Sequence, residues 1–118
     1  MNKIQNYING EFQPSADGRT IDDINPATGE VIGTIPASTS ADVQHAVDAA
    51  TAVRTEWAAL SIGERSNWLD KIADSLESKF EKIASLESLD TGKPISLARA
   101  VDATRSVTNF RFFAKFAK

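Results

Sequence analysis

One arginine stands among residues that predict a buried helix face. Arg105 shares one side of a helical pattern with Val101, Thr108 and Phe112. A guanidinium on an apolar face needs an anionic partner to offset the loss of its hydration. The nearest candidate is Asp102, three residues earlier, at the spacing of a local helical ion pair. The alternative is a carboxylate of a bound ligand, for which the planar fork of guanidinium donors is well shaped. From the residues alone, an ion pair within the protein is the favoured interpretation, with Asp102 or with a carboxylate elsewhere in the fold.

A second candidate is Asp90, which the sequence places at the C-terminal end of a helix. The segment "LDTGKP" ends that helix, because Gly92 suits a left-handed cap and Pro94 cannot continue it. An aspartate there meets the negative end of the helix dipole and is unfavourable unless a cation compensates it. Lys93 is the simplest such cation. The alternative is a hard metal cation, held by Asp90 and nearby backbone carbonyl oxygens.

Other reactive constellations are missing from the 118 residues. The chain has no cysteine, which excludes a thiolate nucleophile and a disulfide framework within it. It has no G-x-G-x-x-G, and "TGKP" is not a phosphate loop, because Glu87 stands in place of the first glycine and Pro94 in place of Ser or Thr. For His45, the one histidine, a solvated or capping role is favoured. We therefore expect no catalytic and no cofactor-binding residue within this chain.

The elements that position these residues begin with a β-hairpin arm over residues 1–36. In "NYINGEF", apolar and polar residues alternate around Asn9 and Gly10, a pair that favours a tight turn. The segments "TIDDINP" and "VIGTIP" are two further short strands, separated by a turn at Gly29. We expect three or four short strands with little core of their own.

Residues 37–118 show the periodicity of about four α-helices. The first begins at a capping pair, Thr39 and Asp42, and the second at a capping box of Ser61 and Glu64. The apolar stripe expected on the first helix is Val43, Ala46, Val47, Ala50, Val53 and Trp57, and that on the second is Trp68, Leu69, Ile72, Ala73 and Leu76.

The third helix ends near Asp90, and the last runs from about Ser96 to the end of the chain. The last helix carries four aromatic rings, which spread over more than half of its circumference, as is typical of a helix covered on several sides. A chain that ended at Lys118 would leave at least one ring in water. We therefore expect the chain to be part of a longer protein. The rings belong to Phe110, Phe112, Phe113 and Phe116.

Composition and charge narrow the class of protein. Hydrophobic residues make up 42% of the chain and charged residues 25%, which is ordinary for a globular fold. The formal charge is -3, and the basic residues form no stripe that would neutralise a nucleic-acid backbone. No apolar run approaches the length of a membrane span, and the first residues are unlike a secretory signal. The expectation is a cytoplasmic protein that binds neither nucleic acid nor a membrane.

Several segments resemble the N-terminal portion of the aldehyde dehydrogenase superfamily in sequence and spacing. They are "YINGEF", "NPATGEVIGTIP", "ADVQHAVDAA", "EWAALS", "GERSNWLDKIADSLE" and "LESLDTGKPISLARAVD". The resemblance covers nearly all of the chain, from about Tyr7 to the end. It implies an α/β fold, in which residues 37–118 form the helical first part of the NAD(P)-binding domain of an aldehyde dehydrogenase.

The resemblance also implies an activity for the parent protein. Members of the family oxidise an aldehyde to a carboxylic acid with NAD or NADP, through a catalytic cysteine and a glutamate-activated water. Those residues and the catalytic domain lie beyond Lys118 in the family, so this chain alone is expected to be inactive. The expected partners are the missing C-terminal remainder, a small aldehyde substrate, and further subunits of a homodimer or homotetramer.

Two groups of site residues follow from the resemblance. In betaine-aldehyde-type members, a potassium or sodium ion is bound by the aspartate of "LDTGK" and by backbone oxygens just before the "NP" turn. These positions are Asp90, Asp23 and Ile24 in this sequence. The helix positions of Val101 and Arg105 line the substrate tunnel in the family.

The residues around Arg105 suggest a branch of the family. The segment "ATRSVTNFRFFA" is similar to the branch that oxidises muconic semialdehydes, whose substrates carry a carboxylate. Many other members are apolar at the position of Arg105. This context makes a ligand carboxylate the favoured partner in place of Asp102. The chain departs from the branch at Thr104, where proline is usual.

Two other interpretations stay open. In a betaine-type or general aldehyde dehydrogenase, Arg105 would only pair with Asp102. In a non-catalytic interaction module, the Phe-rich helix and the hairpin arm would mediate self-association or binding to a full-length subunit.

Overall fold

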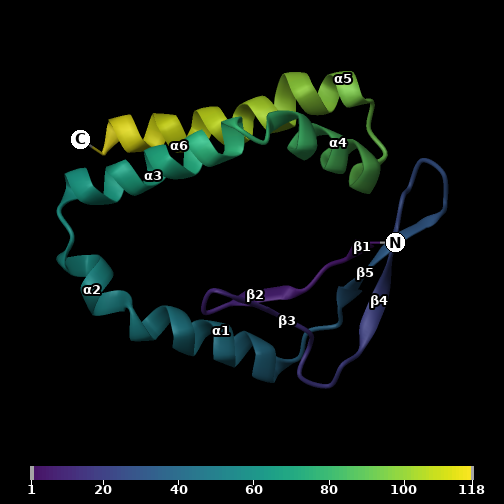
Figure 1. Ribbon diagram of the computed structural model, residues 1–118, viewed down its shortest axis with the longest axis horizontal. Helices are drawn as coiled ribbons and strands as arrows, with labels where there is room; N and C mark the ends of the chain where they lie inside the picture. The colour runs from purple at the N-terminus through teal and green to yellow at the C-terminus, as the bar shows by residue number, and fades with distance from the viewer. Residues whose placement is uncertain (1, 118) are drawn as a thin grey trace. The chain divides into compact units, whose positions relative to one another are not determined.

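The computed structural model describes residues 2–117, which form two compact units (Figure 1). The first unit, Met1–Glu56, contains the strands and the first helix, and the second, Trp57–Lys118, is helical. The predicted hairpin arm followed by helices is confirmed. The expected domain boundary at residue 36 concerns a longer protein and stays a prediction. Among the helices of residues 2–117, none combines the length and the apolar character that a membrane span requires.

A tight hairpin begins the first unit. Strands β2 (Asn6–Ile8) and β3 (Glu11–Gln13) are antiparallel, with Tyr7 opposite Phe12. Asn9 and Gly10 connect them with φ angles of 53° and 83°, which glycine and asparagine tolerate best. The rings of Tyr7 and Phe12 lie 4.9 Å apart between centroids, so this cross-strand pair adds to the stability of the hairpin. The turn predicted at Asn9-Gly10 is confirmed.

The first unit also contains a three-stranded sheet in the order β1-β5-β4. Strands β4 (Thr20–Ile24) and β5 (Val31–Pro36) are the two predicted strands, antiparallel and joined by a turn in which Gly29 has a φ of 74°. Strand β1 (Asn2–Lys3) pairs with β5 in parallel. Two residues are too short to carry a strand pattern, so the sequence did not reveal β1.

The first helix, α1 (Ser40–Ala52), begins at the predicted capping box. The backbone N–H and the hydroxyl of Thr39 both donate to Oδ2 of Asp42, at 2.7 and 2.9 Å. Oδ1 of the same carboxylate accepts the N–H of Ala16 at 2.9 Å. Asp42 is buried, so one side chain both caps α1 and binds the loop after β3 to the start of this helix.

The expected continuous helix to Trp57 is wrong, because it breaks at Val53. A short second helix, α2 (Arg54–Ala59), follows the break. The hydroxyl of Thr51 donates to the carbonyl of Val47 at 2.8 Å, and such back-bonding bends helices. Alternating β-branched residues at this point further weaken the helix. The apolar stripe of α1 is also exposed, at Val43, Ala46, Val47 and Val53, although the small hairpin contacts this helix through β2.

The second unit contains two long helices and a composite one. Helix α3 (Ile62–Glu77) begins at the predicted capping box of Ser61 and Glu64, and α4 (Phe80–Thr91) ends at Gly92, whose φ is 71°. The composite helix consists of α5 (Ile95–Leu97), η1 (Ala98–Ala103) and α6 (Thr104–Phe116).

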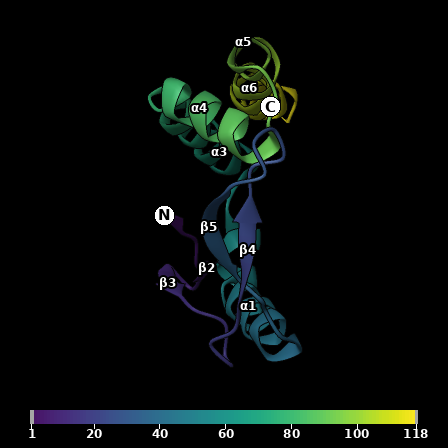
Figure 2. The same cartoon turned by 90° about the vertical axis from the view of Figure 1, so that its right-hand side faces the viewer.

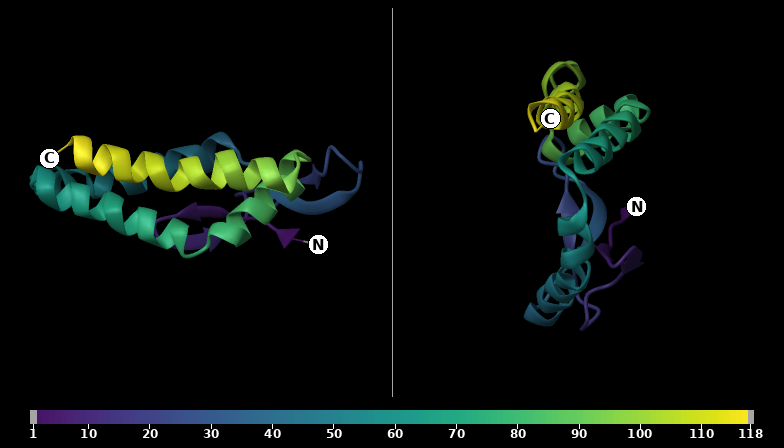
Figure 3. Two further views of the ribbon diagram at one scale, coloured as in Figure 1. Left: turned by 90° about the horizontal axis from the view of Figure 1, so that it is seen from above. Right: turned by 90° about the vertical axis from the view of Figure 1, so that its left-hand side faces the viewer.

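Helices α3 and α6 run antiparallel and side by side (Figure 3). The buried positions on this seam are mostly small, namely Ser66 and Ala73 on α3 and Val107 and Ala114 on α6. Small side chains let the two backbones approach closely. The sequence pattern predicts that the larger residues Trp68 and Ile72 of α3 are buried, but both are exposed. The pattern selects residues by hydrophobicity and takes no account of side-chain volume, so it favours Trp68 and Ile72 over the small residues that the seam requires.

The last helix contains a π-helical segment that the sequence did not reveal. Segment η1 packs on α4, where Ala84, Ala98 and Ala103 form a fully buried cluster. Figure 2 shows α4 beside the composite helix that contains η1. In an α-helix, residues five apart stand about 140° apart around the axis, so Ala98 and Ala103 could not both face α4. A π turn is closed by i→i+5 hydrogen bonds and is wider, which brings both alanines to one side. The uniform α-helix expected from Ser96 is therefore wrong over Ala98–Ala103.

We predict that Ala103→Leu lowers the free energy of unfolding of this chain by about 1–3 kcal/mol, because the larger side chain does not fit between η1 and α4. Urea denaturation followed by circular dichroism measures this. Ala100 lies in the same segment but is exposed. Ala100→Leu should therefore stay within about 0.5 kcal/mol of the wild type. Equal losses in the two variants would contradict the proposed packing.

The cap of α1 predicts a dependence on pH. The pKa of Asp42 lies below its ordinary value of 3.8, chiefly because the N–H of Thr39 donates to the carboxylate. A lowered folded-state pKa contributes stability above the unfolded-state value, and this stability is lost as pH falls through the folded-state value. Asp42→Asn should therefore flatten the fall in urea midpoint between about pH 5 and about pH 2. Asp48→Asn, an exposed change on the same helix, should keep the wild-type slope.

Candidate functional site

The two residues expected to line a substrate tunnel lie at the junction of η1 and α6. Val101 belongs to the π-helical segment and is half-buried, and Arg105 lies in the first turn of α6 and is exposed. The junction is held by its own hydroxyls. Thr104 donates to the carbonyl of Arg99 at 2.9 Å, and Ser106 donates to that of Ala103 at 2.7 Å. These two bonds join the first turn of α6, which carries Arg105, to the segment η1, which packs on α4.

Arg105 does not pair with Asp102. Asp102 is instead bonded to Lys93, with 2.8 Å between Nζ and Oδ2. Within residues 2–117, the guanidinium of Arg105 has no hydrogen bond and no ion pair. The local ion pair favoured from the residues alone is therefore wrong. The expectation that Arg105 is buried is also wrong, because the buried residues of α6 are Val107 and Ala114.

Lys93 lies between two carboxylates. Its Nζ is 2.8 Å from Oε1 of Glu87 and 2.8 Å from Oδ2 of Asp102. The hydroxyl of Ser88 donates to the backbone carbonyl of Lys93 at 2.7 Å, which fixes the lysine after the Gly92 cap. The pKa of Lys93 is raised above its ordinary value, first by the hydrogen bond to Asp102 and then by that to Glu87. This cluster connects the end of α4 to η1.

Sequence reasoning missed this cluster because its members do not stand three or four residues apart on one helix. Lys93 and Asp102 are separated by nine residues and by the turn that follows α4. The sequence offers one signal for the cluster, the positive charge of Lys93 directly after the Gly92 cap. From the sequence alone, this charge is assigned to Asp90. That assignment is wrong, because Lys93 binds Glu87 and Asp102.

The three residues expected to bind a monovalent cation are divided between the units. Asp23 and Ile24 lie in β4, and Asp90 lies near the end of α4 and is exposed. The pairing of β4 with β5 shifts in register between Asp23 and Ile24, and such an irregularity locally disrupts the ladder of hydrogen bonds. Backbone carbonyl and carboxylate oxygens fit a hard cation. Residues 2–117 contain no group of three or more His, Cys, Asp or Glu side chains that could hold a metal ion, and the cation site stays a prediction.

The end of α6 presents an exposed aromatic cluster, formed by Phe112, Phe113 and Phe116. Phe112 packs edge-on against Phe113 at 5.2 Å and stacks on Phe116 at 5.8 Å between ring centroids. The three side chains are 58%, 58% and 79% exposed. Phe110 is half-buried. The expectation that a ring would remain in water within these residues is confirmed for all three members of the cluster.

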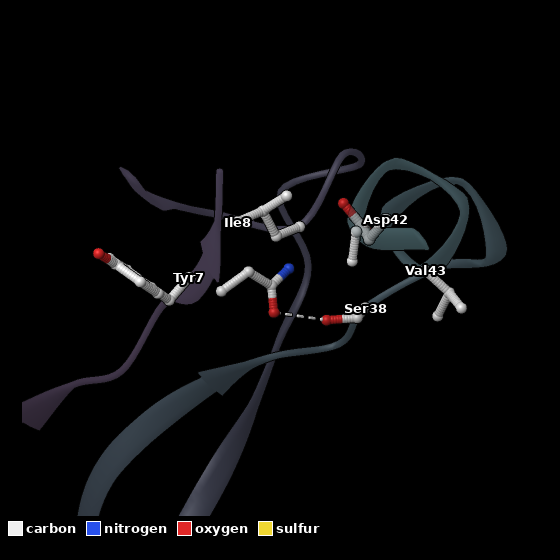
Figure 4. Close-up of a pocket in the computed structure, with 7 residues that line it drawn as sticks. Tyr7, Ile8, Ser38, Asp42 and Val43 are labelled. Atoms are coloured by element: carbon white, nitrogen blue, oxygen red, sulfur yellow. Dashed lines mark hydrogen bonds between the residues drawn. The ribbon is translucent and has the colours of Figure 1, made fainter. Parts of the chain in front are cut away.

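One side of α1 and the hairpin enclose a shallow hollow of about 220 Å³. Figure 4 shows Tyr7, Ile8 and Val43 at this hollow, with Ser38 donating to Oδ1 of Asn6 at 2.9 Å. Two of its lining residues are ionisable, Tyr7 and Asp42, and Asp42 is already committed to the cap of α1. The Ser38 hydroxyl is bonded to Asn6, so the lining does not combine a nucleophile with a neighbouring base.

Comparisons of sequence place these features among known proteins. Residues 12–118 match the sequence model of the aldehyde dehydrogenase family. The 2-hydroxymuconic semialdehyde dehydrogenase of Pseudomonas sp. (strain CF600) is 42% identical over 100% of this chain and 24% of its own length. The 2-aminomuconic semialdehyde dehydrogenase of Danio rerio is 44% identical, over 94% of this chain and 22% of its own. The betaine aldehyde dehydrogenase of Rhizobium etli CFN 42 is 40% identical, over 98% of this chain and 24% of its own length.

Solved structures agree with this result. PnpE in complex with nicotinamide adenine dinucleotide is 42% identical with a TM-score of 0.92, over 96% of this chain and 23% of that chain. The NAD+ complex of aldehyde dehydrogenase from Bacillus cereus is 35% identical with a TM-score of 0.91, over 98% of this chain and 24% of that chain. This chain thus spans about a quarter of the length of the relatives that it matches.

Arg105 and Arg111 should differ in their effect on stability. Arg111 donates to Asp74 at 2.9 Å and to Glu77 at 2.6 Å, and so connects α6 to α3. Arg105→Met should change the free energy of unfolding of this chain by less than about 0.5 kcal/mol, because the side chain is exposed and no hydrogen bond or ion pair of residues 2–117 is lost. Arg111→Met should lower it by more. Thermal unfolding of the two variants tests this, and a larger loss for Arg105→Met would indicate a structural role that the contacts do not show.

Proposed function

Since this chain belongs to the aldehyde dehydrogenase family, we propose that it forms the N-terminal quarter of an NAD(P)-dependent enzyme that oxidises an aldehyde to a carboxylic acid. The observation that carries this proposal is the match over residues 12–118 together with relatives at 42% and 44% identity. The chain contains no cysteine, so the nucleophile of the reaction must come from the rest of the protein.

The proposed substrate is a semialdehyde that carries a second, distal carboxylate. Muconic semialdehyde dehydrogenases are among the relatives of this chain. Arg105 is exposed and has no ion pair within residues 2–117. A guanidinium binds a carboxylate through two parallel N–H donors, which fixes both the position and the orientation of the ligand. These features support Arg105 as the carboxylate-binding residue.

In this proposal, the residues of the chain bind and orient the substrate. Arg105 holds the distal carboxylate, and Val101, one turn before it, provides an apolar wall for the carbon chain. Holding a substrate at its far end reduces the freedom of the reacting aldehyde and so raises the fraction of productive encounters. When bound, NAD or NADP supplies the acceptor for the hydride, and we assign no residue of this chain to that step.

Further partners are part of the same proposal. The exposed cluster of Phe112, Phe113 and Phe116 suits a contact with the remainder of the enzyme, because apolar patches of this kind mark interaction surfaces. We place a potassium or sodium ion at Asp90 and the backbone of Asp23 and Ile24. A cytoplasmic homodimer or homotetramer completes the proposal.

Two alternatives rest on specific observations. A betaine-type or general aldehyde dehydrogenase is supported by the relative from Rhizobium etli, and Arg105 would then have no role in selecting the substrate. A non-catalytic interaction module is supported by the exposed aromatic cluster alone. The family match favours the enzyme over the module, since it covers the sequence from residue 12 to residue 118.

The test is a kinetic comparison in the full-length enzyme. Arg105→Met should raise KM for a semialdehyde with a distal carboxylate by about tenfold or more, because a hydrogen bond to a charged group is lost. KM for a neutral aldehyde of similar length should stay unchanged. Arg99→Met, which removes an exposed arginine of η1, serves as the matched control. An equal rise for both aldehydes would exclude Arg105 as the residue that selects the carboxylate.

A further inference from the structure

Asp102 is the acidic residue that could compete with a ligand for Arg105. Residues three and four apart on a helix can contact each other. At these distances from Arg105, the sequence has Val101, Asp102, Thr108 and Asn109. Asp102 is therefore the one acid at helical spacing from the guanidinium. If Asp102 bound Arg105, a carboxylate ligand would have to displace it.

The structure shows that this competitor is already bound. Oδ2 of Asp102 lies 2.8 Å from Nζ of Lys93, and the two side chains are 32% and 26% exposed. Lys93 comes from the turn after α4, whose backbone is fixed by the bond from Ser88 and by the left-handed Gly92. Glu87 holds the same ammonium at 2.8 Å. The lysine thus reaches Asp102 from a fixed position and with a second carboxylate to retain it.

We propose that Lys93 sets the selectivity of the Arg105 site for carboxylate substrates, by holding Asp102 and so leaving the guanidinium unpaired. Lys93 is a positioning residue, because it acts through Asp102 and Arg105 and touches no reacting atom. The inference rests on the proposed function, since it needs a ligand carboxylate at Arg105.

The balance of contacts supports this arrangement. Lys93 and Asp102 are both partly buried, where a charge-assisted hydrogen bond is stronger than at an exposed surface. A pair between Asp102 and Arg105 would lie on the exposed side of α6, where local ion pairs contribute little. The neighbouring Ala103 is packed against α4, which keeps Asp102 near the turn that carries Lys93. Removing Lys93 would leave Arg99 and Arg105, each three residues from Asp102, as the nearest basic residues along the helix, and Arg99 is already paired with Glu81.

The test uses the full-length enzyme and two aldehydes, one with a distal carboxylate and one neutral. Lys93→Met should raise KM for the acidic aldehyde about three- to tenfold, since the released Asp102 now competes for Arg105. KM for the neutral aldehyde and kcat for both should stay close to the wild type. The double variant Lys93→Met/Asp102→Asn should restore the low KM for the acidic aldehyde, because the competing carboxylate is gone. Failure of this rescue would overturn the proposal.

Two control variants separate this role from a purely structural one. Arg99→Met breaks the ion pair with Glu81, which also connects η1 to α4, and should not change selectivity. Lys93→Arg keeps a cation beside Asp102 and should retain most of the selectivity. If Lys93→Met does not fold, Asp102→Asn alone gives the answer. It should bind the acidic aldehyde at least as well as the wild type, and a rise in its KM would overturn the proposal.

A crystal structure of full-length Lys93→Met tests the inference without any activity measurement. The expected result is a contact under about 4 Å between Asp102 and Arg105, the range of an ion pair. An Asp102 that stays away from Arg105 would contradict the inference. If instead Arg105→Met keeps its preference for acidic aldehydes, the proposed role of Arg105 in substrate binding fails, and the structure of Lys93→Met still shows whether Lys93 keeps Asp102 from Arg105.

Discussion

The packing of three alanines sets the positions of the residues around the proposed substrate site. Ala98 and Ala103 both lie against Ala84 of α4, with no exposed surface left on any of the three. Two residues five apart reach one neighbour only if the helix widens, which is the physical reason for the π turn. Close packing tolerates little change in volume, so this contact determines where Val101, Asp102 and Arg105 lie.

Several charged residues of the second unit form two groups of ion pairs. Lys93, Glu87 and Asp102 form a partly buried cluster between the end of α4 and η1, and Arg111 pairs with Asp74 and Glu77 between α6 and α3. These contacts join elements that the alanine packing and the small-residue seam have already brought together. Arg105 lies outside both groups, and this isolation is the feature that the proposed substrate binding uses.

Much of the local structure could be predicted from the sequence because its signals are local. The Asn9-Gly10 turn, both capping boxes and the Gly92 cap depend on backbone angles and on side chains within three residues of each other. The family resemblance was equally accessible, since it is carried by contiguous segments. Hydrophobic periodicity located the helices but not their buried faces. It favoured Trp68 and Ile72, whereas the seam between α3 and α6 selects small residues at Ser66 and Ala73.

The sequence by itself therefore determined which segments form strands, turns and helices, and to which family the chain belongs. Only the tertiary structure decided which partner each charge has and which face each helix buries. Asp102 is three residues from Arg105 and nine from Lys93, yet it binds Lys93. The spacing of residues along a helix predicts only which residues of that same helix can contact each other. The packing of η1 on α4 brings a distant lysine within 2.8 Å, and so removes Asp102 as a partner for Arg105.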